Sequence, residues 1–136
     1  MRIVLTAALL AVAAVACGGD EATAPEGEWI AVSGVSEGAP VELVDGFAVS
    51  IGFDGDLIEG TAACNRYSGV AEVGSDGSFS ASELSWTEIG CEPAVMEVER
   101  AYLVSLAGFT DYVVADEVLT LTGPDHEWVF EPSASG

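Results

Sequence analysis

Residues 60–69, Gly-Thr-Ala-Ala-Cys-Asn-Arg-Tyr-Ser-Gly, are the stretch around which the rest of the chain is organised. They combine the end of an expected strand with a cysteine, an asparagine and a closing glycine. This order predicts a tight corner, whose structural residues we take to be Gly60, Asn65 and Gly69. An asparagine side chain can bond the backbone two residues further on and tolerates a left-handed conformation, which suits a corner.

The N-terminus has the pattern of a lipoprotein signal peptide, predicted over residues 1–16. Arg2 gives a positive start, residues 3–15 are apolar and rich in alanine, and small residues precede Cys17. Such a short run, followed by polar residues, is typical of a signal peptide rather than a membrane span. We expect Cys17 to carry diacylglycerol and palmitate and to anchor the exported chain to the cell envelope, in the outer membrane if the host has one. The alternative is ordinary secretion with cleavage after Ala16.

The two remaining cysteines, Cys64 and Cys91, are expected to form a disulfide. If Cys17 carries lipid, the three cysteines of the chain resolve into one anchor and one pair. Export also implies an oxidising compartment, in which a free pair would be unusual. Two sulfurs and a distant His126 lack the paired spacing of a zinc site. We therefore expect neither a metal nor another cofactor.

The composition is strongly acidic. The chain has 23 Asp and Glu residues against three Lys and Arg residues, with a formal net charge of −20. Nucleic acid is not expected as a partner, because binding it requires clustered basic residues. The acidic surface favours solubility and suits a saline habitat or a basic partner. We expect Arg66, one of the few cations, to pair with surface carboxylates.

The chain is organised as one domain at residues 28–132, between a flexible tether at residues 17–27 and a tail at residues 133–136. Short segments of alternating apolar and polar residues, bounded by Gly- and Asp-containing turns, predict strands. The apolar positions of the segment 79–87 change parity, which predicts a β-bulge near Ser82 and Glu83. The expected strands cover residues 28–33, 47–53, 57–62, 69–73, 79–87, 111–115, 118–122 and 126–131, with a short extended piece at 41–44.

Residues 93–107 predict a helix. Pro93 suits its first turn, an apolar stripe runs along it, and Gly108 suits a left-handed cap. About eight short strands and one helix indicate the α+β class. The expected fold is a curled antiparallel β-sheet or a partly open barrel, with the helix packed on it or in it.

Several landmarks follow one another along the chain: Trp29, Phe53, Gly60, the segment Ala63-Cys64-Asn65-Arg66-Tyr67-Ser68-Gly69, the segment Trp86-Thr87-Glu88-Ile89-Gly90-Cys91, the helix, Tyr112, Leu119-Thr120-Leu121 and Trp128-Val129-Phe130. Their order resembles a META domain, the family that includes heat-shock HslJ-like bacterial lipoproteins. Ala63 and Ile89-Gly90 depart from the family pattern, which usually has Gly and Met-Ala there. The resemblance implies an envelope lipoprotein without a defined reaction, similar in shape to secretin pilotins that hold an apolar ligand in a cracked barrel.

No catalytic residue is predicted, because His126 is alone and Ser33, Ser50 and Ser68 lie in no nucleophile motif. We expect a non-enzymatic, lipid-anchored envelope protein that binds a protein partner or an apolar ligand, or that serves an envelope stress role. This predicts an apolar cavity or patch between helix and sheet. One alternative is a purely structural surface lipoprotein with a filled core and no ligand. The other is a small secreted hydrolase, which needs a nucleophile, base and acid in one cleft.

Overall fold

A computed structural model describes residues 22–134 of the chain. The predicted signal peptide and Cys17 lie outside the described residues. Within residues 22–134, no helix is both long enough and apolar enough to cross a membrane.

In this part of the chain, nine strands form one antiparallel sheet, and one helix lies between the sixth and seventh strands in sequence. The order across the sheet is β6-β5-β4-β3-β1-β9-β8-β7, with β2 paired to β1. The elements are β1 Gly27–Ser36, β2 Ala39–Pro40, β3 Ser50–Asp54, β4 Leu57–Ala62, β5 Asn65–Val73, β6 Phe79–Trp86, α1 Pro93–Gly108, β7 Asp111–Ala115, β8 Val118–Gly123 and β9 His126–Pro132. The predicted α+β class and curled antiparallel sheet are confirmed.

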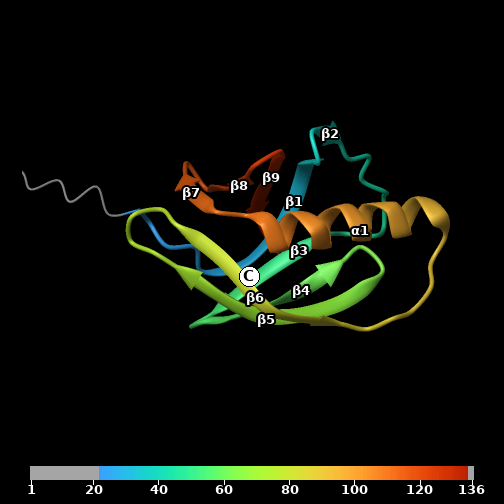
Figure 1. The fold of residues 1–136 in the computed structure, drawn as a ribbon, viewed down its shortest axis with the longest axis horizontal. Coiled ribbons are helices and arrows are strands. Elements are labelled where there is room, and N and C mark those ends of the chain that lie inside the picture. Colours follow the sequence, from blue (N-terminus) through green and yellow to red (C-terminus); the bar gives the residue numbers. More distant parts are fainter. Residues whose placement is uncertain (1–21, 135–136) are drawn as a thin grey trace, which may run out of the picture.

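The sheet curls until its two outer strands meet at one end (Figure 1). The Phe79 N–H donates to the Thr110 carbonyl at 2.8 Å, and the Tyr112 N–H donates to the Gly77 carbonyl at 2.9 Å. A bridge between Ser78 and Asp111 joins the same ends. Helix α1 lies across the opening and contacts β6, β1, β4 and β9 (Figure 1). The result is a partly open barrel covered by one helix.

Packing of one apolar stripe holds α1 on the sheet. Val95, Val98, Tyr102 and Leu106 are all buried, as the apolar pattern predicted. The Tyr102 ring makes an edge contact with the Trp128 ring, with 5.1 Å between the ring centroids. Because burying each such side chain contributes about 2 kcal/mol, packing stabilises this helix more than intrinsic propensity does.

The sequence prediction is wrong around residues 41–49. Residues 41–44 form a loop, and β3 begins at Ser50 rather than at residue 47. Phe47 is 39% exposed, although the alternation placed it on the buried face. Gly46 has a φ of 85°, so the chain turns there and Phe47 precedes the regular strand geometry.

Two further local predictions have different outcomes. The register between β5 and β6 shifts at Ser68 and Val70, opposite residues 82–85, and Glu83 has a φ of 53°, so the predicted bulge is confirmed. The predicted left-handed cap at Gly108 is wrong, because Gly108 is the last residue of α1 and has no positive φ, and the chain leaves the helix at Phe109 in an extended conformation. A glycine suits position 108 for another reason: a Cβ atom there would lie 3.1 Å from the His126 ring.

Candidate functional site

The corner predicted at residues 60–69 is a two-residue turn between β4 and β5. Ala62 pairs with Asn65 across the turn, and Ala63 has the left-handed conformation, with a φ of 61°. The left-handed position therefore belongs to Ala63 and not to Asn65, which is the first residue of β5. β5 also begins four residues earlier than the predicted strand at 69–73.

A disulfide joins this turn to the segment that enters helix α1. Cys64 and Cys91 are bonded across a sequence separation of 27 residues, with 6.0 Å between their Cα atoms. The predicted pairing is confirmed. It holds the loop at residues 87–92, which connects β6 to α1, against the β4–β5 turn.

Asn65 makes the second connection between the same segments, and its side chain is buried. Its Nδ2 group donates to the Ile89 carbonyl at 3.0 Å, and its Oδ1 atom accepts from the Ile89 N–H at 2.7 Å. Oδ1 also accepts from the Thr87 hydroxyl at 2.8 Å. The sequence interpretation assigned Asn65 a local turn bond, whereas these partners lie at least 22 residues away in sequence.

Glu99 of helix α1 completes this network from the other side. One carboxylate oxygen accepts from the Asn65 N–H at 2.6 Å, and the other accepts from Nδ2 of Asn65 at 2.8 Å. Glu99 is buried, which is tolerable for a carboxylate only when it is hydrogen-bonded. Nothing local in the sequence distinguishes Glu99 from the other glutamates, so it was not predicted as part of the site.

The two glycines predicted at the corner allow close backbone contacts rather than turns. A Cβ atom at Gly60 would overlap the Ser50 carbonyl of neighbouring β3. One at Gly69 would lie 2.6 Å from a Leu84 methyl group of β6. Both positions keep adjacent strands close where the sheet curls.

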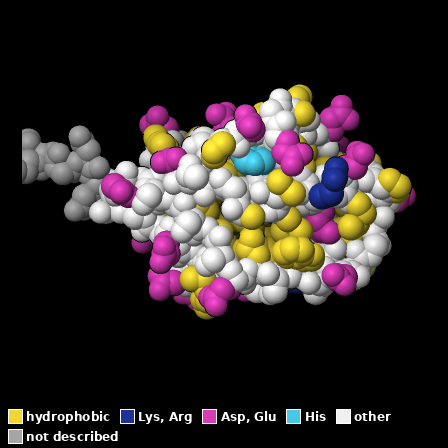
Figure 2. Space-filling view, viewed as in Figure 1, with side chains coloured by type: hydrophobic (Ala, Val, Ile, Leu, Met, Phe, Trp, Pro, Cys, Tyr) yellow, Lys and Arg dark blue, Asp and Glu magenta, His cyan; other side chains and the backbone are white. Residues whose placement is uncertain are grey.

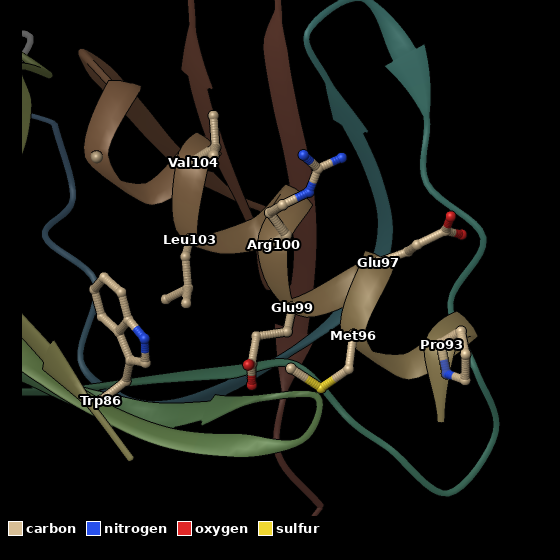
Figure 3. Close-up of a pocket in the computed structure, with 9 residues that line it drawn as sticks. Trp86, Pro93, Met96, Glu97, Glu99, Arg100, Leu103 and Val104 are labelled. Atoms are coloured by element: carbon tan, nitrogen blue, oxygen red, sulfur yellow. The ribbon is translucent and has the colours of Figure 1, made fainter. Parts of the chain in front are cut away.

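An open apolar groove of about 740 Å³ lies between the end of β6 and helix α1. Trp86 forms one wall, and the α1 side chains Met96 and Leu103 face it across the groove (Figure 3). Trp86 is 45% exposed and Val104 is 41% exposed. The full lining is Trp86, Pro93, Met96, Glu97, Glu99, Arg100, Leu103, Val104 and Ala107. This is the exposed apolar patch between helix and sheet that the sequence analysis expected of a binding protein.

The groove interrupts an acidic surface. Figure 2 shows hydrophobic side chains gathered below α1, with most acidic side chains of that face placed around them. The described residues include two of the three basic residues, Arg66 and Arg100, and all acidic residues except Asp20 and Glu21. Neither arginine side chain pairs with another residue in the 22–134 range, so the expected pairing of Arg66 is wrong.

A second groove follows the other side of α1. Its outer wall is the loop after β2, with Val41, Leu43 and Val44, and its inner wall includes Val98 and Ala101 of the helix. Glu97, Arg100 and Val104 line both grooves, so they form a ridge between the two.

His126 lies outside both grooves and meets two serines that the sequence analysis did not consider. Its Nδ1 atom lies 3.0 Å from the Ser105 hydroxyl and 3.5 Å from the Ser36 hydroxyl, and it accepts from the Glu37 N–H at 3.3 Å. Ser105 is completely buried and Ser36 is 8% exposed. The contacts join β9, α1 and the turn after β1. None of Ser33, Ser50 and Ser68 takes part in them, although Ser50 bonds Tyr67 in the core.

The core between α1 and the sheet contains a pair of buried tyrosines, Tyr67 and Tyr102. The Tyr67 hydroxyl donates to the Ser50 carbonyl at 2.7 Å and lies 2.6 Å from the Tyr102 hydroxyl. Because the Tyr67 proton points to Ser50, Tyr102 donates to Tyr67. Burial raises the pKa of both hydroxyls well above the ordinary value for tyrosine. The pair joins α1 to the sheet.

The N-terminal boundary of the folded part lies earlier than residue 28. β1 begins at Gly27, and the Ala22 N–H donates to the Ser75 carbonyl at 2.9 Å. Pro25 is buried. Residues 22–26 of the predicted tether therefore lie against the domain.

Comparison with known proteins agrees with this architecture. A family model described as the META domain matches residues 22–135. A search of curated proteins gives no match.

Several solved structures share the fold. The NMR structure of a protein from Burkholderia xenovorans has a TM-score of 0.66 and 21% identity, covering 84% of this chain and 94% of that one. A second NMR structure has a TM-score of 0.60 and 23% identity, with coverage of 78% and 88%. The crystal structure of a DUF4847 family protein from Bacteroides vulgatus has a TM-score of 0.58 and 14% identity, with coverage of 79% and 93%. At these identities the likeness shows a common fold alone.

Proposed function

The chain belongs to the META domain family, and from that premise we propose that it is a non-enzymatic, lipid-anchored protein of the cell envelope that binds an apolar segment of another envelope protein. The groove between β6 and α1 is the observation that carries this proposal. A role in envelope stress would be a consequence of this binding.

The composition of the groove supports protein binding. Monomeric proteins rarely leave contiguous apolar surface exposed unless it binds something. Interface centres are depleted of charge and enriched in aromatic residues, Met and Arg, and the groove brings together Trp86, Met96 and Arg100. A purely structural lipoprotein would have no reason to keep Trp86 half exposed.

The N-terminal connection supports action close to the membrane. The domain makes its first described backbone contact at Ala22, five residues after the predicted lipid site at Cys17. Five residues span at most about 18 Å even when fully extended. A lipid on Cys17 would therefore hold the groove close to other membrane-attached proteins.

The surroundings of His126 favour binding over hydrolysis. Its Nδ1 atom is engaged by the Glu37 N–H and by a Ser105 hydroxyl that solvent does not reach. A hydrolase needs an accessible nucleophile beside its base. Here the histidine and serines serve to join β9, α1 and the β1–β2 turn.

The anchor is tested by the intact mass of the protein purified from its native membrane. We expect a chain that begins at Cys17 and carries a diacylglycerol and an acyl chain. A Cys17→Ala variant should be released from the membrane fraction. An unmodified chain in the membrane, or a variant that stays there, would refute the anchor.

The groove is tested with Nile red, an uncharged dye that fluoresces in apolar surroundings. The full chain with Cys17→Ser, which cannot be lipidated, should bind the dye. Leu103→Asn and Trp86→Gln should each weaken binding several-fold. The matched control is Val113→Asn, because Val113 is 59% exposed on β7 and does not line the groove. Equal dye binding by all variants would refute a binding role for this groove.

A further inference from the structure

Resting on the proposed function, we infer that the groove between β6 and α1 binds the side chain of a lysine in the partner's apolar segment. The methylene stem of this lysine lies between Trp86 and Leu103, and its ammonium group reaches the carboxylate of Glu99. Three features support the inference: a buried negative charge without a counterion, the way in which Asn65 already binds that carboxylate, and the side chains around it.

Glu99 is a buried anion that lines the groove. It is 5% exposed, and no residue within 22–134 forms an ion pair with it. Figure 3 shows its carboxylate below α1, in the space that Trp86 and Met96 also enter, whereas the guanidinium group of Arg100 lies on the other side of the helix. A charge removed from water attracts an opposite charge more strongly than an exposed charge does, because little water screens it. An incoming cation would therefore favour Glu99 over the exposed carboxylates of the surface.

The bonds from Asn65 select the kind of cation. Its backbone N–H donates to one oxygen of Glu99 at 2.6 Å, and its Nδ2 group donates to the other oxygen at 2.8 Å. An ionised carboxylate has about four acceptor positions, so each oxygen keeps one position free. A guanidinium group binds best to both oxygens at once, and Asn65 already takes that approach. An ammonium group is a compact charge that can use one remaining position, which favours lysine over arginine.

The walls of the groove suit the rest of a lysine side chain. An aromatic ring such as that of Trp86 attracts a cation placed over its face. Leu103 offers apolar contact to the methylene stem, which lysine buries readily while its charged end stays polar. The sulfur of Met96 accepts from the Cys91 N–H at 3.4 Å, and Cys91 is held by the disulfide. This wall of the site is therefore in place before the partner binds.

The charge of the molecule agrees with a basic partner. The formal net charge of −20 attracts cations from solution and speeds their encounter with the protein. A second copy of the 136-residue chain could not supply the lysine, because its three basic residues are all arginines. The lysine therefore belongs to a different protein.

The test compares n-hexylammonium, n-hexylguanidinium and 1-hexanol, which share one apolar chain and differ in the end group. Each is titrated at constant ionic strength into the full chain carrying Cys17→Ser, and NMR follows the indole N–H of Trp86, which is 45% exposed. Hexylammonium should bind at least about tenfold more tightly than hexanol, and more tightly than hexylguanidinium. Equal binding of hexylammonium and hexanol would overturn the inference. Equal or tighter binding of hexylguanidinium would overturn the choice of lysine.

Two variants locate the bound cation. Glu99→Gln should remove most of the preference for hexylammonium over hexanol. Glu97→Gln is the matched control, because it removes the same charge from the same helix at an exposed position that lines the groove. It should leave the preference unchanged, and equal effects of the two variants would overturn the inference. Glu99→Gln also weakens the bonds to Asn65, so circular dichroism checks its fold; if it does not fold, the comparison of the three compounds decides.

A peptide tests whether a protein supplies the cation. Ac-Ser-Leu-Lys-Leu-Ser-NH₂ should displace hexylammonium from the Cys17→Ser chain. The same peptide with an acetylated lysine keeps the stem and loses the charge, so it should displace hexylammonium at least about tenfold more weakly. Equal displacement by the two peptides, or displacement by neither, would overturn the assignment to a partner's lysine.

The failures of the two proposals are distinguishable. If Nile red binds in a Leu103-dependent way and hexylammonium binds no better than hexanol, the lysine inference fails and the apolar binding function stands. If neither the dye nor any of the hexyl compounds depends on Leu103, both fail.

Discussion

At the scale of single residues, Asn65 and Glu99 determine how the helix meets the β4–β5 turn. Asn65→Ala would remove four side-chain hydrogen bonds and leave one oxygen of a buried carboxylate without its partner. We expect the free energy of unfolding to fall by about 3 kcal/mol, because an unsatisfied buried acceptor keeps its desolvation cost. Urea denaturation measures the change.

Ser68→Ala is the control for this experiment, because Ser68 is exposed on the same strand. It should change the stability by less than about 0.5 kcal/mol. If Asn65→Ala were as mild as Ser68→Ala, the network would not contribute to stability.

The Tyr67–Tyr102 pair makes stability depend on alkaline pH. Burial raises the pKa of both hydroxyls in the folded state, whereas tyrosine in the unfolded chain ionises near pH 10. The contribution of the two neutral tyrosines to the free energy of unfolding is therefore complete below about pH 10. It is lost as the pH rises toward the pKa that the hydroxyls have in the folded state. Each tyrosine should lower the free energy of unfolding by about 1.4 kcal/mol per pH unit in that range.

Urea denaturation of the Cys17→Ser chain between pH 8 and 11.5 measures this dependence. The three basic residues are all arginines, and Cys64 and Cys91 are bonded, so tyrosines dominate titration in this range. Tyr102→Phe should remove about half of the pH dependence contributed by the pair. An unchanged slope in the variant would show that Tyr102 ionises normally in the folded protein.

The roles of individual residues were only partly predictable from the sequence. The sequence singled out Gly60, Asn65 and Gly69 as structural residues, but it assigned them to local turn chemistry. Their contacts are with β3, β6, the loop at residues 87–92 and α1. Such partners depend on strand register, which a single sequence does not specify. Glu99 is the clearest example: its burial is understandable only once Asn65 lies beside it.

At the scale of elements, the Cys64–Cys91 disulfide connects the turn between β4 and β5 to the segment before α1. Replacing Cys64 and Cys91 together by Ala should lower the free energy of unfolding by about 3.5 kcal/mol, because the unfolded chain loses a closed loop. Urea denaturation of the double variant measures the loss.

The structure of the variant should survive this change, since Asn65 still bonds Ile89 in the loop that contains residue 91. Far-ultraviolet circular dichroism before denaturation checks this. A loss below about 1 kcal/mol would mean that the network, rather than the cross-link, keeps the two segments together.

Most elements were predictable because their signals are local. Pro93 and the apolar stripe mark α1, and alternating residues mark β4 and β7 to β9. The errors occur where tertiary contacts override alternation. The extended piece predicted at 41–44 is the wall of a groove, and Phe47 is exposed after the turn at Gly46.

At the scale of the whole molecule, the fold was predictable from the sequence. For the site, only its type was predictable, and its residues were not. The sequence favoured an apolar patch between helix and sheet. It did not identify Trp86, Met96 and Leu103 as its members, because Trp86 is at the end of a strand and the others belong to the helix. Only the curl of the sheet brings β6 alongside α1. Met96 and Leu103 also looked like part of the core stripe until the buried side of α1 was known.

The net charge of the molecule leads to a final prediction about salt. The chain carries a formal net charge of −20, and the described residues include two arginines, neither of which forms an ion pair with residues 22–134. Repulsion among the carboxylates therefore opposes the compact state. Raising NaCl from 10 to 500 mM shortens the Debye length from about 30 Å to about 4 Å, so the free energy of unfolding should rise. Choline chloride at the same ionic strength should stabilise the protein equally, because the effect is screening. Stabilisation by NaCl alone would instead indicate specific cation binding, and no stabilisation by either salt would show that the acidic groups are too well hydrated to repel one another.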